Sequence, residues 1–244
     1  MIDFTNVTRR FGSKTAVDDL SLSVRSGEVF ALLGPNGAGK TTAIKMLVGL
    51  LRPNSGTVSV FGNDLVRQTR QAVAHIGYIP DQPFLYDKLS GREFLDFVGD
   101  MRGLDRDTRR QRIARECDNF DLGEFIDNLT ETYSHGMKQR LVFASALLHD
   151  PAALVIDEPM VGLDPRSMRL VKDLLQQRAG EGAVVLMSTH TLAVAEEIAD
   201  RIGIVDHGHL HFNGTIEQLR DKFPARHNSL ESLFLEMTNG NNHR

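Results

Sequence analysis

Residues 34 to 41 read Gly-Pro-Asn-Gly-Ala-Gly-Lys-Thr, and they directly follow the apolar run Val29-Phe30-Ala31-Leu32-Leu33. The octapeptide has the form G-x-x-x-x-G-K-[ST], which joins a strand to a helix in phosphate-binding loops. Its glycines leave room for backbone N–H groups to surround phosphate oxygens, and Lys40 adds a positive charge. The Thr41 hydroxyl is placed to ligate Mg²⁺, and the following helix points its positive end at the same anion. The stretch therefore predicts a nucleotide site.

Composition sets limits on what surrounds this site. The chain has 244 residues, 41% of them hydrophobic and 25% charged, with a net charge of -4. That length allows one large α/β domain or two small ones, and the charge predicts no general attraction to nucleic acid or anionic lipid. The single cysteine, Cys117, fits a reducing compartment, and we expect it to fill apolar space. We see no signal peptide and no apolar run of about 18 residues, so we expect no direct membrane insertion.

The order of patterns along the chain predicts an α/β fold. Residues 1 to about 30 alternate like antiparallel β-hairpins. Apolar strands then alternate with helical patterns, which implies parallel pairing with right-handed crossovers. We predict a phosphate-loop NTPase core with a mainly parallel sheet, an N-terminal antiparallel β-subdomain and an inserted helical subdomain. The whole chain forms one domain, with the core at about 1–87 and 134–220, the helical subdomain at about 88–133, and a C-terminal helix and tail at about 221–244.

Helical spacing dominates the inserted segment, as in Phe94, Leu95, Val98 and Met101. Within it lies an arginine run interleaved with acids, which we interpret as a solvated helix face: Arg106, Arg109, Arg110, Arg112 and Arg115. The last helix is expected to pack on the core through one stripe: Leu230, Leu233, Phe234 and Met237.

Polar residues follow two further apolar strands. Asp157-Glu158 comes after Leu154-Val155-Ile156, and His190 comes after the strand predicted at 183–188. Because ligands bind beyond the carboxyl ends of parallel strands, these groups can converge with the phosphate loop. We expect Asp157 to hold Mg²⁺ together with Thr41, and Glu158 to act as the general base on a water in line with the terminal phosphate. His190 is expected to contact that phosphate and position the water.

A second helix start has the features of an anion site. Ser134 is a good N-cap, and Gly136 leaves backbone exposed near the beginning of the helix. One nucleotide needs one such cradle, so two cradles in one chain suggest that nucleotides are shared between chains.

The segment 133–140 also carries a family resemblance. Tyr133-Ser134-His135-Gly136-Met137 resembles the Leu-Ser-Gly-Gly-Gln signature of the ATP-binding subunits of ABC transporters, and Lys138-Gln139-Arg140 extends the match. Phe11-Gly12 is similar to the family's adenine-stacking position, and Gly162-Leu163-Asp164 to the loop that touches the other subunit. The tail at 230–236 resembles the ABC-2-like exporter subgroup. The resemblance covers nearly the whole chain.

This resemblance implies ATP and Mg²⁺ as ligands. It places ATP against one group of residues in each chain: Phe11, Val17, Gly34, Pro35, Asn36, Gly37, Ala38, Gly39, Lys40, Thr41 and Thr42. A second group would contact the partner's nucleotide: Ser134, Gly136, Met137 and Asp164. His135 and Met137 depart from the signature, so that contact is expected to differ. The family's glutamine-loop position falls on Asp81, with Gln82 beside it. Either residue could reach Mg²⁺ or the attacking water.

The expected function is ATP hydrolysis that powers an ABC transporter, in the direction of export. The resemblance implies a head-to-tail homodimer, or a pair with a similar cassette, at the cytoplasmic face of the cell membrane. A separate integral membrane subunit would dock on residues 88–133 and the loop at 80–86. The alternative is a soluble ABC ATPase in translation or DNA maintenance, although those usually carry two cassettes or a long coiled-coil insert. A small-molecule kinase would lack the segment 133–140.

The histidines at 207, 209 and 211 raise one more alternative. Their spacing would place them on one strand face, where they could bind a metal ion. We expect no carboxylate or cysteine to join them at a site, so we favour an exposed hairpin face.

Overall fold

The apolar run that precedes the phosphate loop forms the strand β3 (Val29–Leu33), all five residues of which are buried. A strand is buried throughout when both faces of its sheet are covered. Here Phe30 and Leu32 face one core cluster, and Ala31 and Leu33 face the other. The computed structural model describes residues 1–160 and 164–222 of the protein. Its central layer is the six-stranded sheet that contains β3.

This central sheet has the order β10-β9-β3-β8-β7-β6. All its neighbours pair in parallel except β10 with β9, which pair antiparallel. Its other strands are β6 (Ile76–Ile79), β7 (Ala153–Asp157), β8 (Val184–Thr189), β9 (Arg201–Asp206) and β10 (His209–Gly214). A second, antiparallel sheet has the order β2-β1-β4-β5. It consists of β1 (Ile2–Phe11), β2 (Lys14–Val24), β4 (Ser55–Val60) and β5 (Asn63–Asp64).

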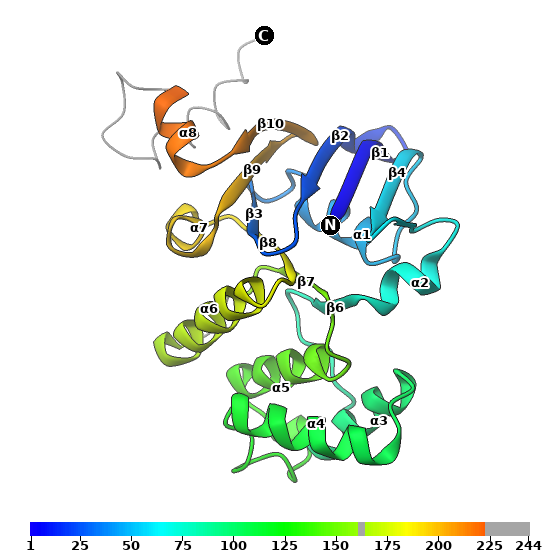
Figure 1. Cartoon of the computed structure of the whole chain (residues 1–244), viewed down its shortest axis with the longest axis vertical. Coiled ribbons are helices and arrows are strands. Elements are labelled where there is room, and N and C mark those ends of the chain that lie inside the picture. Colours follow the sequence, from blue (N-terminus) through cyan, green and yellow to red (C-terminus); the bar gives the residue numbers. More distant parts are fainter. Residues whose placement is uncertain (161–163, 223–244) are drawn as a thin grey trace.

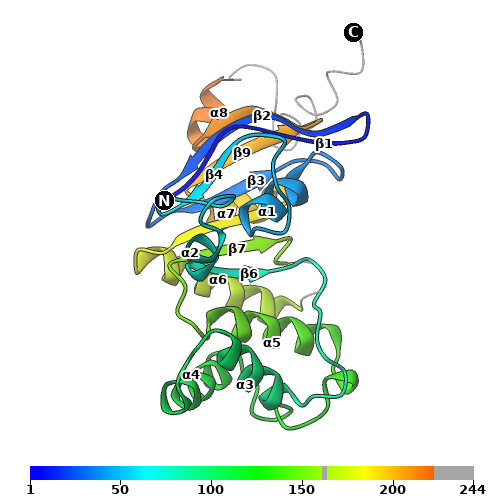
Figure 2. The same cartoon turned by 90° about the vertical axis from the view of Figure 1, so that its right-hand side faces the viewer.

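Helices cover the central sheet and extend beyond it. They are α1 (Lys40–Leu47), α2 (Thr69–Ala74), α3 (Gly91–Met101), α4 (Arg106–Asn119), α5 (His135–Leu147), α6 (Pro165–Gly180), α7 (Leu192–Ile198) and α8 (Ile216–Lys222), with a 3-10 turn at Thr130–Thr132. One face of the sheet packs on α1 and the antiparallel sheet, and the other packs on α5, α6 and α7. Helices α3 and α4 gather with α5 at one end of the molecule, far from the antiparallel sheet (Figures 1 and 2).

Local sequence explains how the helical segment starts and how it is attached. Ser90 and Glu93 form a reciprocal capping box at the start of α3, and Asp105 caps α4. Arg109 of α4 pairs with Asp96 and Asp100 of α3. The arginine run therefore does more than face solvent, because it also fastens α4 to its neighbour.

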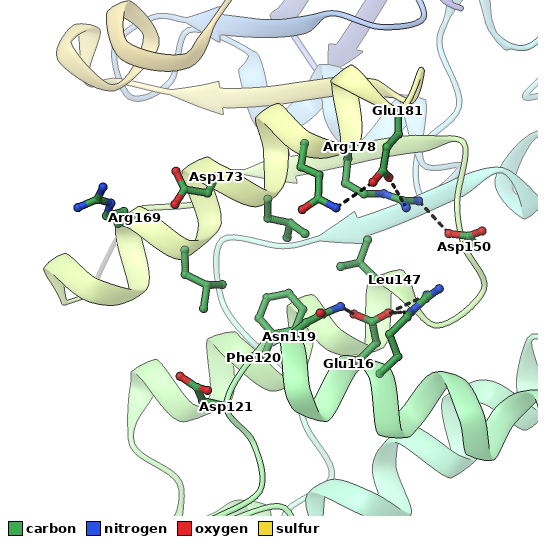
Figure 3. A pocket seen from close by; sticks show the side chains of 14 residues that line it. Glu116, Asn119, Phe120, Asp121, Leu147, Asp150, Arg169, Asp173, Arg178 and Glu181 are labelled. Atoms are coloured by element: carbon green, nitrogen blue, oxygen red, sulfur yellow. Dashed lines mark hydrogen bonds and ion pairs between the residues drawn. The ribbon is translucent and has the colours of Figure 1, made fainter.

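A cleft of about 740 Å³ lies between this helical end and α6 (Figure 3). Phe120 and Leu147 line it on the helical side. Across the cleft, Arg178 of α6 donates hydrogen bonds to Asp150 and Glu181. The helical segment and the core thus meet along a partly open seam.

The predicted fold class is confirmed, with a mainly parallel sheet, an antiparallel N-terminal sheet and inserted helices. Some elements were not predicted, namely α2, β5 and α8. Met101, placed on the helical pattern, is 72% exposed. The predicted tail stripe (Leu230, Leu233, Phe234, Met237) lies outside the described residues. Over the ranges 1–160 and 164–222, the structure contains no helix long and apolar enough to span a membrane.

The histidine alternative also has an outcome. His207 lies in the turn with φ +47°, outside β10, so the three histidines do not share one strand face. Carboxylates are near after all, because His207 Nδ1 is 2.8 Å from Asp206 Oδ2 and His209 Nε2 is 3.6 Å from Asp18 Oδ2. In the part of the chain that the structure describes, no group of three His, Cys, Asp or Glu side chains could hold a metal ion.

Candidate nucleotide site

The phosphate loop lies between β2 and β9, at distances that only glycine allows. A Cβ on Gly39, whose φ is +110°, would lie 2.3 Å from the carbonyl oxygen of Ala16. A Cβ on Gly34 would lie 2.2 Å from the carbonyl oxygen of Val205. Real Cβ atoms do not approach backbone so closely, and L side chains rarely adopt such a φ. The glycines therefore fix the loop against its own chain and leave its inner side free.

Helix α1 begins at Lys40 without a side-chain cap. The backbone N–H groups of a first turn lack partners inside their own helix, so an anion can bind there. Lys40 is only 5% exposed, and its Nζ donates to the carbonyl oxygens of Gly34 (2.7 Å) and Pro35 (3.2 Å). The lysine is thus already folded over the loop, with its charge directed at the space that a phosphate would fill.

The two acids at the end of β7 diverge as expected. Asp157 is 2% exposed, and its Oδ1 accepts a hydrogen bond of 2.5 Å from Ser188 Oγ on the neighbouring strand β8. That same hydroxyl accepts a bond from the backbone N–H of Glu158. Ser188 had not been singled out from the sequence, and it anchors both acids at once.

Glu158 turns the other way, with a φ of +53° that is uncommon for a residue with a side chain. Its Oε1 lies 3.6 Å from Lys40 Nζ, and its Oε2 lies 3.0 Å from His190 Nδ1. The structure therefore joins three predicted residues, from three separate segments of the chain, in one line of contacts: Lys40, Glu158 and His190.

Burial and the concentration of negative charge shift the ionisation of this region. Burial raises the pKa of the Asp81 carboxyl, and the charges of Asp157 and Glu158 raise it further. Burial, and the charges of Asp157 and Asp81, raise the pKa of Tyr78 to about 12. Burial lowers the pKa of Lys40, while Glu158 and Asp157 oppose that shift. Excess carboxylates around one lysine form a site that a cation would relieve.

The donors present fit Mg²⁺ bound together with a nucleotide. Among the described residues, no three His, Cys, Asp or Glu side chains are close enough to hold a metal by themselves. Mg²⁺ is commonly held by one or two carboxylates, waters and the phosphates of its substrate, and a hydroxyl can complete such a set. Asp157 and Thr41 would hold it here, with Asp81 close to the same charge cluster.

A cavity of about 300 Å³ opens over the loop. Its lining contains most of the residues predicted to contact ATP in this chain, and also Lys14 and Ala16, which the sequence did not indicate. The residues that line it are Phe11, Lys14, Ala16, Asn36, Gly37, Ala38, Gly39, Lys40, Thr41, Thr42, Asp81 and Glu158. Val17 is buried, with its Cγ2 beside Gly39, so it supports the loop from behind. Asp81 lines the cavity, and its neighbour Gln82 is exposed outside this lining.

The residues predicted to contact the partner's nucleotide lie outside the lining of this cavity. Ser134 caps α5, and its Oγ accepts a hydrogen bond of 3.3 Å from the N–H of Met137. A Cβ on Gly136 would meet no atom within 4 Å. Asp164 is exposed and accepts hydrogen bonds from the N–H and Oγ of Ser167 at the start of α6. Its predicted neighbours Gly162 and Leu163 lie outside the described residues.

Comparison with known proteins identifies this arrangement. The family model described as ABC transporter matches residues 17–161, which include the phosphate loop, the second helix start and Asp157-Glu158. The chain belongs to the ABC transporter family. Within that family it is an ATP-binding subunit, as the resemblance in the sequence had predicted.

Individual ABC proteins add detail. The chain is 41% identical, over 86% of its length, to the uncharacterized ABC transporter ATP-binding protein YhcH of Bacillus subtilis. It is 38% identical, over 90% of its length, to the daunorubicin/doxorubicin resistance ATP-binding protein DrrA of Streptomyces peucetius. It covers 68% and 66% of those two proteins. A solved ATP-binding subunit of an ABC transporter superposes with a TM-score of 0.90 at 31% identity, covering 97% of this chain and 99% of the other. The predicted likeness to exporter-type ABC subunits is confirmed.

Proposed function

We propose that this ABC subunit hydrolyses ATP with Mg²⁺ and that the hydrolysis drives export through a separate integral membrane subunit. The observation that carries the proposal is the line of contacts from Lys40 through Glu158 to His190 at the mouth of the phosphate loop. In this line the Glu158 carboxylate, our proposed base, lies between the charge of Lys40 and the ring of His190, an arrangement that supports phosphoryl transfer to water. The relative DrrA, named for resistance to drugs, supports the exporter direction.

Binding of ATP would rearrange this line of contacts. The terminal phosphates compete for Lys40, whose Nζ is bonded to loop carbonyls and lies 3.6 Å from Glu158. Release from Lys40 leaves Glu158 Oε1 able to accept a proton from a water in line with the γ-phosphate. His190 keeps the carboxylate oriented through Oε2 and reaches the same phosphate. Mg²⁺, when bound by Thr41 and Asp157, supplies neutralisation of the charge that develops on the phosphate oxygens.

The helix start at Ser134 supports a shared nucleotide. Its Gly136 has open space above it, although no contact in the described chain requires a glycine there. A closely approaching phosphate from a second copy gives that space a use. In a head-to-tail dimer, each ATP would lie between one copy's phosphate loop and the other copy's Ser134, Gly136 and Met137, with Asp164 facing the partner.

An exposed aromatic surface supports docking of a membrane subunit. Phe84 is 74% exposed, Tyr86 47% and Phe97 41%. The ring of Tyr86 lies between the other two, with centroid distances of 5.8 Å to Phe84 and 5.6 Å to Phe97. Neighbouring exposed aromatics of this kind mark contact surfaces between proteins. They connect the loop after β6, which includes Asp81, with helix α3, so a docked partner would adjoin both the nucleotide site and the helical segment.

A pull-down tests this function. The tagged protein, recovered from detergent-solubilised membranes, should bring with it a multi-span membrane protein. The double substitution Phe84→Ala/Tyr86→Ala should abolish that recovery while ATP binding is retained. The matched control is Leu50→Ala, which removes another exposed apolar side chain, 63% exposed, on the segment after α1.

The pull-down also separates the alternative. Recovery of ribosomes or DNA in place of a membrane protein would replace the proposal with a soluble ABC ATPase in translation or DNA maintenance. The proposed location at the cytoplasmic face of the membrane depends on this docking, so a result that excludes docking also removes the proposed location.

A further inference from the structure

The proposed adenine platform is a side chain with little support of its own. Phe11 is the last residue of β1, beside Gly12, and its ring is 46% exposed while lining the nucleotide cavity. The β1–β2 pairing is irregular here, with register shifts on both sides of Arg9. A half-exposed ring at a hairpin tip has several accessible rotamers, and ordering it on binding would reduce affinity.

Arg9 restrains this ring. Its guanidinium carbon lies 4.6 Å from the centroid of the Phe11 ring. Its Nη1 donates a hydrogen bond of 3.0 Å to the carbonyl oxygen of Arg52. Within the described chain, the buried Nε of Arg9 has no hydrogen-bond partner, which leaves the aromatic face as a principal neighbour of this group. A guanidinium stacked at this distance attracts the ring and fixes its plane.

The hydrogen bond from Arg9 to Arg52 connects the Phe11 ring with the segment after the phosphate-loop helix. Arg52 lies in the segment that follows α1, the helix that begins in the phosphate loop. That segment is tied to β1 a second time, through the N–H of Asn54 to the carbonyl of Thr8 (2.8 Å) and the N–H of Arg10 to Asn54 Oδ1 (2.8 Å). The contacts thus run from the Phe11 ring through Arg9 to Arg52, in the segment that follows α1.

We propose that Arg9 is a positioning residue for the nucleotide base. It covers one face of the Phe11 ring, so that the base stacks on the other face, and it holds that ring at a fixed place relative to the phosphate loop. Arg9 is not part of the cavity lining, so it acts through Phe11 rather than on ATP itself. The inference rests on the proposed contact between Phe11 and the base of ATP.

The test compares two probes, ATP and inorganic tripolyphosphate, by calorimetric titration of the purified chain. Arg9→Gln should weaken ATP binding about threefold, the size expected for a half-exposed cation–ring contact. Binding of tripolyphosphate, which has no base, should stay at the wild-type value. Arg9→Lys keeps the charge but loses the flat stacking group, so its ATP affinity should lie between those of the wild type and Arg9→Gln. The control Arg10→Gln removes the exposed neighbouring charge and should change neither probe.

A double substitution isolates the route. Phe11→Ala should weaken ATP binding about tenfold, and adding Arg9→Gln to it should have no further effect. Equal losses for ATP and tripolyphosphate in Arg9→Gln would overturn the inference, because they would indicate a direct charge effect or a damaged loop. Additive losses in the double variant would overturn it as well. If Phe11→Ala binds ATP as tightly as the wild type does, the proposed contact between Phe11 and the base is wrong. That result differs from one in which Phe11→Ala weakens ATP binding but Arg9→Gln does not.

Discussion

Helices α1 and α5 both begin with a turn that we propose binds phosphate, but the glycines of the two turns have different surroundings. At α1, Gly39 is required by the chain itself, because a Cβ would lie 2.3 Å from the backbone of Ala16. At α5, a Cβ on Gly136 would meet nothing within 4 Å. Lys40 at the first start is buried, whereas Ser134 at the second is exposed. The glycine at the start of α1 is thus required by contacts within one copy, whereas the start of α5 is an open surface, which agrees with the proposed contact with a second copy.

The opposite end of α5 is fixed to the core. Just beyond the helix, the carbonyl of Leu148 accepts a bond of 2.9 Å from Arg112, and His149 Nε2 lies 3.0 Å from the carbonyl oxygen of Ile76 at the start of β6. Arg102 donates to the same Ile76 oxygen. Contacts that fix the last turn of α5 give the whole helix a defined direction, which the proposed contact of its first turn with a second copy requires.

The largest expected effect concerns Glu158, beside the phosphate loop. Glu158→Gln should lower the rate of ATP hydrolysis between about a hundredfold and ten-thousandfold, because the general base is lost while the contacts that bind phosphate remain. ATP affinity, measured by titration, should be retained. Glu124→Gln, at an exposed position in the helical segment, is the control. Near-normal hydrolysis by Glu158→Gln would remove Glu158 from the base role.

Alanine at each of the two glycines tests the comparison itself. Gly39→Ala should reduce the free energy of unfolding by about 3 kcal/mol, from a forbidden φ and a backbone clash, and should abolish ATP binding. Gly136→Ala should leave the free energy of unfolding unchanged or raise it by up to about 1 kcal/mol, because alanine favours helix. It should nevertheless lower ATP turnover.

Denaturant titration and steady-state ATPase assays measure these outcomes. If Gly136→Ala destabilises the isolated chain as strongly as Gly39→Ala, then Gly136 is also required by its own chain. That result would contradict the proposed difference between the two helix starts.

The fixed end of α5 gives a pH prediction. Burial, and the charge of Arg102, lower the pKa of His149 to about 4 from an ordinary value near 6.5. The unfolded chain therefore binds a proton between these values while the folded chain does not. The contribution of His149 to the free energy of unfolding is fully present above pH 6.5. It decreases by about 3 kcal/mol as the pH falls toward 4.

Unfolding free energies of the wild type and of His149→Gln, measured between pH 7 and pH 4.5, isolate this contribution from that of the carboxylates. The wild type should show the steeper fall. Parallel curves for the two proteins would mean that His149 is not a buried neutral anchor.

The smallest effect concerns the residue at the edge of the cavity. Asp81→Asn should raise the Mg²⁺ concentration needed for half-maximal hydrolysis about tenfold, because Asp81 belongs to the charge cluster with Asp157 and Glu158. Gln82→Ala should leave it unchanged, since Gln82 is outside the cavity lining. The reverse result would assign the glutamine-loop role to Gln82.

The sequence predicts what depends on neighbours along the chain. The run of five apolar residues, the phosphate loop and the acids Asp157 and Glu158 are contiguous signals, and the structure places them as expected. Helix α2 was missed because its sequence has no apolar stripe, and Ala72 is its one buried residue. Ser188 was missed because it meets Asp157 only through the β7–β8 register, which depends on strand order. Ala16 and Arg9 were missed for the same kind of reason.

A subunit-mixing assay tests the central claim, that one copy supplies the phosphate loop and a second copy completes the site. Lys40→Ala and Gly136→Asp chains, each inactive alone, are mixed, and ATP hydrolysis is measured. In head-to-tail pairs, each mixed dimer regains one intact site, so random pairing should restore about a quarter of wild-type hydrolysis. Mixtures that stay as inactive as their components would contradict the shared site.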